Sequence, residues 1–335
     1  MFIRKIILLM CASFWLCSCG QAQEAPILSQ HRENFKQTEK DAGSKTTALP
    51  NATDSPVAVK GRAVIASPYN ADVRLHCGND TIRINQLLRR GKNKGLTDAN
   101  ELVCFYANEL KETPYVAHTL EGKTEKLTIN IDQLDCTTFV ETLYALVRTT
   151  LSGSTSWRDY ARNLENIRYR DGKMGDYSTR LHYMSDWIVD NSRRGNIVDV
   201  TDRVACHRDR VVTLNFMTTH RSSYPSLKED SIFIKIKNIE KGYYNHRFPY
   251  IKKSDLNTES VKKVVRRGDF VGLVTTTSGL DLSHLGIIEF DSKGNPVLLD
   301  ASSIGGKVML EHVDLKTQLA PRQGTVGVRI FRMTQ

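Results

Sequence analysis

The sequence lacks an apolar run long enough to cross a membrane, an internal repeat and any Cys-x-x-Cys pair. The first absence excludes a polytopic membrane protein, and the last argues against a structural zinc site. The chain has 335 residues, of which 40% are hydrophobic and 25% are charged, and this composition also excludes collagen-like and coiled-coil proteins. A globular protein remains, with either two domains or one large domain that carries an insertion.

Charge of one sign is not concentrated in any part of the chain. The 47 Lys and Arg residues outnumber the 37 Asp and Glu residues and give a formal net charge of +10. Most basic side chains are interleaved with acidic ones, apart from short runs such as Arg89-Arg90 and Lys262-Lys263. We therefore expect no nucleic-acid partner, and the positive excess indicates an anionic polymer or surface.

Residues 1–18 have the features of a lipoprotein signal peptide. Arg4 and Lys5 precede a short apolar run, and small residues surround Cys19 at its end. This ending resembles a bacterial lipobox, which implies that Cys19 is lipidated and becomes the first residue of the mature protein. We expect a lipid-anchored protein of the cell envelope, in the periplasm or at the outer membrane. The alternative is a simple secreted protein that is cut nearby.

Residues 19–65 are expected to form a flexible tether between the lipid and a folded domain. This segment is polar and poor in aromatic residues, so it buries too little apolar surface to fold. The folded domain is expected to comprise residues 66–335.

Four cysteines follow Cys19, namely Cys77, Cys104, Cys136 and Cys206. If one of them is a catalytic thiol, the others form at most one disulfide, whose pairing the sequence leaves open. Cys104 lies in an apolar helical pattern and is expected to be a buried core residue. The cysteines and histidines lack the paired close spacings that zinc sites use, so we expect no metal and no organic cofactor.

Helical periodicity dominates the first half of the chain, and strand patterns dominate the end. The expected helices are 81–91, 97–112, 136–151, 156–168, 179–193 and 227–240. The expected strands are 269–276, 284–290, 296–301, 306–310 and 325–332, with a hairpin turn from Asp291 to Asn295. Helices followed by antiparallel strands indicate an α+β fold.

Three separated segments carry the candidate catalytic residues. Cys136 begins an amphipathic helix, where the positive end of the helix dipole favours the thiolate, and Asp135 can cap that helix. His284 opens an apolar strand, and pairing across the hairpin brings Asp300 beside it. A carboxylate beside an imidazole fixes the tautomer that a general base needs. Taken singly, each has a structural alternative, a buried cysteine or a core histidine.

Together with Thr113-Pro114-Tyr115-Val116 and Gly268-Asp269-Phe270-Val271, these segments resemble the NlpC superfamily of papain-like cell-wall cysteine amidases. The resemblance implies a papain-like core of N-terminal helices packed on a C-terminal antiparallel sheet. It also implies that Cys136 is the nucleophile and His284 the general base. The third catalytic position of that family is usually His, Asn or Gln, whereas Asp300 occupies it here.

The resemblance covers roughly 113–151 and 265–333, so a large insertion is expected at about 152–264. More narrowly, the chain resembles a lipoprotein branch characterised as N-acetylmuramoyl-L-alanine amidases that act on 1,6-anhydro-muropeptides, because the segment from Gly175 to Trp187 resembles that branch's own insertion. The implied partners are peptidoglycan fragments, and we expect a monomer. The residues assigned to substrate binding are Tyr115, Asp135, Arg180, His182, Tyr183 and Trp187.

The expected helix at 179–193 would present Arg180, Tyr183 or Met184, and Trp187 on one face. Aromatic rings offer flat apolar faces to sugars, and Arg offers donors to a carboxylate. The alternative is an amphipathic core helix with its Trp buried. Two other functions also stay open: an endopeptidase that cuts between D-glutamate and a diamino acid in the stem peptide, and a lipoprotein that binds peptidoglycan fragments without catalysis.

Overall fold

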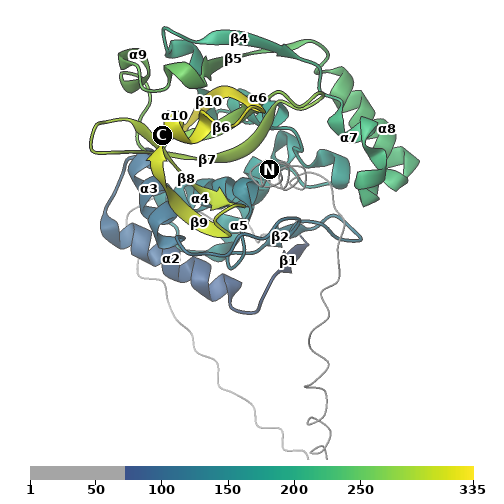
Figure 1. Cartoon of the computed structure of the whole chain (residues 1–335). Helices are drawn as coiled ribbons and strands as arrows, with labels where there is room; N and C mark the ends of the chain where they lie inside the picture. Colours follow the sequence, from purple (N-terminus) through teal and green to yellow (C-terminus); the bar gives the residue numbers. More distant parts are fainter. Residues whose placement is uncertain (1–71) are drawn as a thin grey trace, which may run out of the picture. The chain divides into compact units, whose positions relative to one another are not determined.

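The computed structural model describes residues 72–335, drawn in colour in Figure 1. The expected signal peptide, the tether and the lipidated Cys19 lie outside the described residues. Within the described part, no helix is both long and apolar enough to span a lipid bilayer.

Nine α-helices lie in the described part of the chain, and the longest of them are in its first half. They are α2 (Asp80–Lys94), α3 (Ala99–Glu109), α4 (Cys136–Leu151), α5 (Trp157–Arg168), α6 (Met184–Arg193), α7 (Phe216–Thr219), α8 (Asp230–Lys241), α9 (Glu259–Lys262) and α10 (Leu315–Leu319). The first four expected helices are confirmed as α2 to α5. Side-chain caps fix three of their starts, because Asp98, Asp135 and Ser156 each accept a backbone N–H of the first turn.

The helix expected at 179–193 is wrong in its first part. Asp176 accepts the backbone N–H of Ser178 and thereby caps a short 3₁₀ turn, η3 (Tyr177–Thr179). Arg180 then pairs with Tyr169 in an isolated β-bridge, which holds it in extended backbone. Helix α6 therefore begins only at Met184.

The strands form two sheets in the described residues. They are β1 (Val73–Leu75), β2 (Leu127–Ile129), β3 (Ile197–Asp199), β4 (Arg208–Val212), β5 (His246–Lys252), β6 (Phe270–Thr275), β7 (Leu282–Phe290), β8 (Pro296–Ser302), β9 (Lys307–Asp314) and β10 (Thr325–Met333). β1 and β2 pair in parallel. The larger sheet has eight strands in the order β4-β5-β10-β6-β7-β8-β9, with β3 beside β10, and its pairs are antiparallel. The expected α+β pattern and its five C-terminal strands are confirmed.

The central strands β6, β7 and β8 are buried on both faces over most of their length, which explains their nearly continuous apolar runs. Phe270, Ile287 and Leu299 pack into the main core with helices α2 to α6. Their neighbours along the strands turn to the opposite face, where a second core includes α10. Helix α4 packs against β7 and β8, so the start of this helix lies close to the sheet.

The segment at 152–264 is built into the same sheet. β3 and β5 both pair with β10, and β4 extends the sheet beyond β5. A third apolar cluster joins α7, α8 and the start of α6, and it includes Tyr183, Phe216 and Ile236. In Figure 1, α7 and α8 lie together at one end of the sheet.

Candidate active site

The start of α4 is fixed by a reciprocal capping box. The backbone N–H of Thr138 donates to Asp135 Oδ1 over 2.8 Å, and the backbone N–H of Asp135 donates to Thr138 Oγ1 over 2.9 Å. Cys136, the first residue of the helix, is 8% exposed. Asp135, assigned to substrate binding by the resemblance, uses its carboxylate here as the helix cap. The capping box holds Cys136 at the positive end of the helix dipole.

The β7–β8 hairpin brings His284 to Asp300. His284 Nε2 lies 2.5 Å from Asp300 Oδ2, and the Asp300 side chain is almost fully buried. The strands approach closely because Gly286 has no side chain: a Cβ there would lie 3.0 Å from Asp300 Cβ and 2.8 Å from the Leu299 carbonyl oxygen. The predicted contact across the hairpin is confirmed.

The ring of His284 links this carboxylate to the thiol of Cys136. Burial alone would lower the pKa of His284, but the charge and hydrogen bond of Cys136 and the hydrogen bond of Asp300 raise it well above its usual range. Since Nε2 bonds to Asp300, Nδ1 is the ring nitrogen left for the sulfur. A histidine with a raised pKa stabilises a neighbouring thiolate, and this arrangement activates a nucleophile.

Tyr115 lies beside the segment that precedes the nucleophile. It forms a parallel bridge with Leu134, and its backbone N–H donates to the Gly306 carbonyl over 2.8 Å. The backbone N–H of Val116 donates to the Leu134 carbonyl over 3.1 Å. The backbone of Tyr115 thus lies beside the segment that leads into Asp135 and Cys136.

Glu311, on β9, is a neighbour of Asp300 and His284 that the sequence patterns did not single out. Burial, followed by the charge of Asp300, raises the pKa of Glu311, while Arg322 and His284 lower it. Glu311 can therefore influence the charge of Asp300 and His284. The sequence holds no signal for this role, because pairing of β9 with β8 alone places the residue there.

The other three cysteines of the described part, Cys77, Cys104 and Cys206, do not belong to the cluster of Cys136, His284 and Asp300. Cys77, Cys104, Cys136 and Cys206 are all free thiols, so no disulfide links the cysteines of the described part. Cys104 is 2% exposed in α3, as expected for a core residue. Burial, and then the charge of Glu289, raise the pKa of its thiol to about 12, which leaves it protonated and unreactive.

Arg180 and His182 lie in a buried polar layer before α6. Arg180 pairs with Glu121 over 2.8 Å and lies 3.6 Å from Glu125, and its guanidinium stacks over Tyr177 at 4.8 Å. His182 Nε2 lies 2.8 Å from the Tyr177 carbonyl oxygen. Burial, and then the charge of Arg180, lower the pKa of His182 to about 3, so this ring is neutral near pH 7.

Tyr183 and Trp187 do not offer the sugar-stacking face that the sequence predicted. Trp187 is 1% exposed and packs 5.5 Å from the ring of Phe331. The Tyr183 hydroxyl donates to Glu240 and accepts the backbone N–H of Met217. The expectation of one exposed face with Arg180 is wrong, because Arg180 precedes α6 in extended backbone and the helix turns Trp187 into the core.

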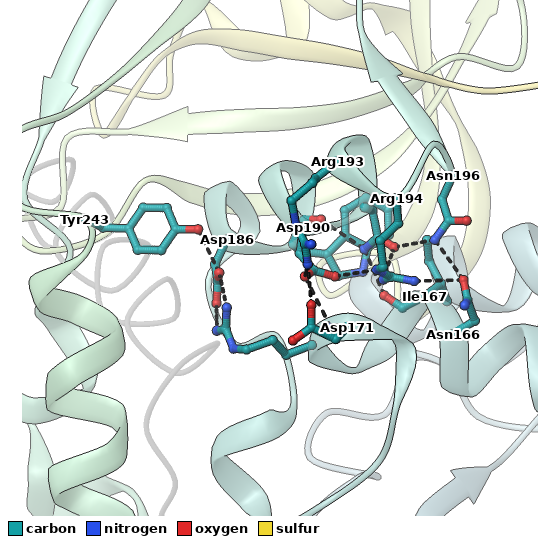
Figure 2. A network of polar contacts seen from close by, with 12 residues as sticks. Asn166, Ile167, Asp171, Asp186, Asp190, Arg193, Arg194, Asn196 and Tyr243 are labelled. Carbon is teal, nitrogen blue, oxygen red and sulfur yellow. Dashed lines mark hydrogen bonds and ion pairs between the residues drawn. The ribbon is translucent and has the colours of Figure 1, made fainter.

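A polar network joins α6 to neighbouring elements within residues 152–264. Arg170 donates to both oxygens of Asp186, and the Tyr243 hydroxyl donates to Asp186 Oδ1 over 2.7 Å. Figure 2 shows Tyr243 pointing toward Asp186, with Asp190 among Arg193 and Arg194 farther along the helix. A hollow of about 620 Å³ adjoins this network, and it is lined by Arg170, Val189, Asn238, Ile239, Gly242, Tyr243 and His246. Cys136, His284 and Asp300 do not line it.

A family model and a crystal structure that match this chain both concern N-acetylmuramoyl-L-alanine amidases. A family model described as AmiA-like, N-acetylmuramoyl-L-alanine amidase-like, matches residues 106–325. The crystal structure of an N-acetylmuramoyl-L-alanine amidase from Bacteroides uniformis is 33% identical, with a TM-score of 0.66 over 71% of this chain and 99% of that one. No relative was found among curated proteins.

Two further crystal structures share the fold. A candidate xylanase from Bacteroides fragilis is 38% identical, with a TM-score of 0.63 over 68% of this chain and 99% of that one. A Legionella pneumophila protein is 20% identical, with a TM-score of 0.60 over 76% of this chain and 94% of that one, and this similarity concerns the fold alone.

Proposed function

Since the chain belongs to the AmiA-like family of N-acetylmuramoyl-L-alanine amidase-like proteins, we propose that it hydrolyses the amide bond between N-acetylmuramic acid and L-alanine in peptidoglycan fragments. The Bacteroides uniformis amidase, which matches over nearly its whole length, supports an amidase function. Our proposal is finer in two respects: the reaction is cysteine-dependent, and the substrate is the 1,6-anhydro form.

The observation that carries the cysteine mechanism is the contact of three side chains from α4, β7 and β8. Cys136 is hydrogen-bonded to His284, and His284 is hydrogen-bonded to Asp300. The nucleophile Cys136 thus contacts the base His284, and the base contacts the orienting group Asp300, which is the arrangement that acyl transfer needs. Their order along the chain, with helices before an antiparallel sheet, also supports the assignment to the papain-like NlpC superfamily.

In the first step, the Cys136 thiolate attacks the carbonyl carbon of the lactyl group. The C–N bond to L-alanine breaks as His284 donates its proton to the leaving amine, and a thioester to Cys136 remains. Asp300 keeps the imidazolium ring oriented and compensates its charge.

The second step returns the enzyme to its starting state. Neutral His284 takes a proton from water, the hydroxide attacks the thioester carbonyl, and Cys136 leaves as the thiolate. The backbone N–H of Cys136 lies in the first turn of α4, where N–H groups have no partner within the helix, so it can donate to the oxyanion in both steps.

The substrate form and the location rest on sequence resemblance. The segment from Gly175 to Trp187 resembles the insertion of amidases that act on anhydro-muropeptides, which supports the anhydro form. The lipobox at Cys19 supports a lipid anchor in the cell envelope.

The test is incubation with a defined anhydro-disaccharide-peptide and mass analysis of the products. We expect the intact stem peptide, beginning with L-alanine, and the free anhydro-disaccharide. An L-alanyl-D-glutamate dipeptide left on the sugar would establish the stem-peptide endopeptidase instead, and unchanged but bound substrate would establish a binding protein. The Cys136→Ala variant controls for contaminating amidases, and the same peptide on a reducing muramic acid tests the anhydro requirement.

A further inference from the structure

Three potential metal ligands, Cys77, Asp80 and Asp132, meet at the end of the small parallel sheet. Because β1 and β2 are parallel, the residues that follow them lie at the same end of the pair. Cys77 follows β1, Asp132 follows β2, and Asp80 opens α2. One ligand atom of each residue lies within 4.8 Å of those of the other two.

Asp80 is the residue that requires an explanation. It is fully buried, and its Oδ2 accepts the backbone N–H of Cys77 over 2.8 Å. Its Oδ1 is buried as well and has no hydrogen-bond partner. Burial of a carboxylate oxygen without a partner is costly, and native proteins avoid it unless a water or an ion supplies the missing contact.

Both oxygens of Asp132 are engaged by neighbouring side chains. Arg83 pairs with its Oδ1, and the Cys77 thiol donates to its Oδ2 over 3.2 Å. Asn130 Oδ1 accepts the backbone N–H groups of Asp132 and Gln133, which fixes the loop. Asp80 thus has one oxygen without a partner, and the second oxygen of Asp132 is held only by the thiol of Cys77. Such support of ligating carboxylates by neighbouring groups is typical of metal sites.

We propose that Cys77, Asp80 and Asp132 bind a zinc ion. On binding, the Cys77 thiol loses its proton to solvent, and Sγ, Asp80 Oδ1 and Asp132 Oδ2 become the three protein ligands. A water molecule takes the fourth position. Neighbouring ligand atoms on tetrahedral zinc lie about 3.5 Å apart, so the three groups need only a small contraction. The thiolate selects zinc over Mg²⁺ and Ca²⁺, which prefer oxygen ligands alone.

The ion would also neutralise the site. Two carboxylates meet one guanidinium here, and the thiolate adds a further negative charge that Zn²⁺ balances. Its position joins the start of α2 to the loop that leads from β2 into α4. The zinc therefore fastens the segment that presents Cys136, and this role is independent of the reaction proposed above.

The sequence alone did not indicate this site. No zinc was expected, because the cysteines and histidines lack paired close spacings. Asp132 lies 55 residues from Cys77 along the chain. Parallel pairing of two three-residue strands brings the two together.

The experiment uses protein treated with EDTA and dialysed, in a Cys136→Ala background that removes the catalytic thiol as a competing ligand. Co²⁺, which replaces zinc and reports thiolate ligation by charge-transfer absorption in the near ultraviolet, is titrated into the protein. Thermal unfolding is then followed with and without Zn²⁺. Cys77→Ser and Asp132→Asn are the test variants, and Cys206→Ser is the matched control, since Cys206 is also partly buried and free.

We expect one equivalent of Co²⁺ with thiolate absorption and a rise in Tm of about 5 °C with Zn²⁺. Both signals should persist in Cys206→Ser and be lost in Cys77→Ser, and Asp132→Asn should weaken Co²⁺ binding at least tenfold. Signals that persist in a folded Cys77→Ser protein would overturn the proposal, as would an equal response to Mg²⁺. If Cys77→Ser does not fold, Co²⁺ affinity unchanged in Asp132→Asn has the same meaning.

Discussion

The Cys136–His284–Asp300 cluster and the Arg170–Asp186–Tyr243 network each centre on a buried carboxylate, but the two carboxylates are used differently. Asp186 accepts from Arg170 through both oxygens and from Tyr243 through Oδ1. Asp300 accepts from His284 through Oδ2, while its Oδ1 has no partner. A saturated carboxylate holds neighbouring elements in place, whereas one with a single cationic partner tunes the charge of that partner. The Arg170–Asp186–Tyr243 network is therefore structural, and the Cys136–His284–Asp300 cluster is equipped for chemistry.

Removal of the nucleophile is the sharpest test of this difference. Cys136→Ala should abolish turnover, since no other described cysteine contacts His284, and it should leave Tm nearly unchanged because little buried volume is lost. Activity and thermal unfolding are measured on the same preparation. Cys206→Ala is the control and should retain activity. Turnover in pure Cys136→Ala protein would remove Cys136 from the mechanism.

Loss of charge at Asp300 should have the next largest effect. Asp300→Asn should lower kcat by about 10²- to 10⁴-fold, with a smaller change in KM, because the group acts on the imidazole rather than on the substrate. Asp300 raises the pKa of His284, so its neutralisation lowers that pKa. The alkaline limb of the profile of kcat/KM against pH should therefore move to lower pH.

Asp202→Asn, at an exposed position, is the matched control for this variant and should leave the profile unchanged. A loss confined to KM, with the alkaline limb unmoved, would make Asp300 a substrate contact and assign the orientation of His284 to another group.

The Trp187→Ala variant tests whether Trp187 is a core residue or a substrate contact. Trp187→Ala should lower the free energy of unfolding by about 3–5 kcal/mol, since a fully buried indole leaves a cavity beside Phe331. Below the lowered Tm, kcat/KM should stay close to that of the parent. Trp157→Ala, at the partly buried start of α5, is the control and should cost less. A tenfold fall in kcat/KM without loss of stability would restore Trp187 to substrate binding.

The smallest expected effect concerns the saturated network. Tyr243→Phe removes one donor from Asp186, which keeps Arg170, so the free energy of unfolding should fall by about 1 kcal/mol and kcat/KM should not change. Chemical denaturation measures the difference. Tyr244→Phe is the matched control, because Tyr244 is 71% exposed and should show no effect. A change in kcat/KM confined to Tyr243→Phe would mean that the two regions are coupled.

Local patterns were sufficient for the catalytic half of the molecule. The α4 start follows from the capping residues Asp135 and Thr138, which lie three apart in the sequence. The contact of His284 with Asp300 follows from a short hairpin whose turn is visible at Asp291 to Asn295. Interactions within a few residues, or across one tight turn, leave a direct trace in the sequence.

The insertion could not be predicted in the same way, because its contacts join distant segments. The residues around Arg180 have a helical pattern in the sequence. Its bridge to Tyr169 and its pairing with Glu121 nevertheless keep Arg180 in extended backbone. The pairing of β3 and β5 with β10 likewise depends on strands far away along the chain. Tertiary contacts of this kind override local helix propensity.

The hairpin of β7 and β8 also orders the events by which the enzyme becomes active. His284 and Asp300 lie 16 residues apart and meet through a tight turn, so their contact closes a short loop. Cys136 reaches them only when α4 docks on β7 across a long stretch of chain, and such non-local contacts form slowly. We therefore expect the contact between His284 and Asp300 to form before Cys136 reaches His284. The chain would then become able to hydrolyse its substrate only when α4 docks on β7, and a nascent chain would have no active nucleophile before its fold is complete.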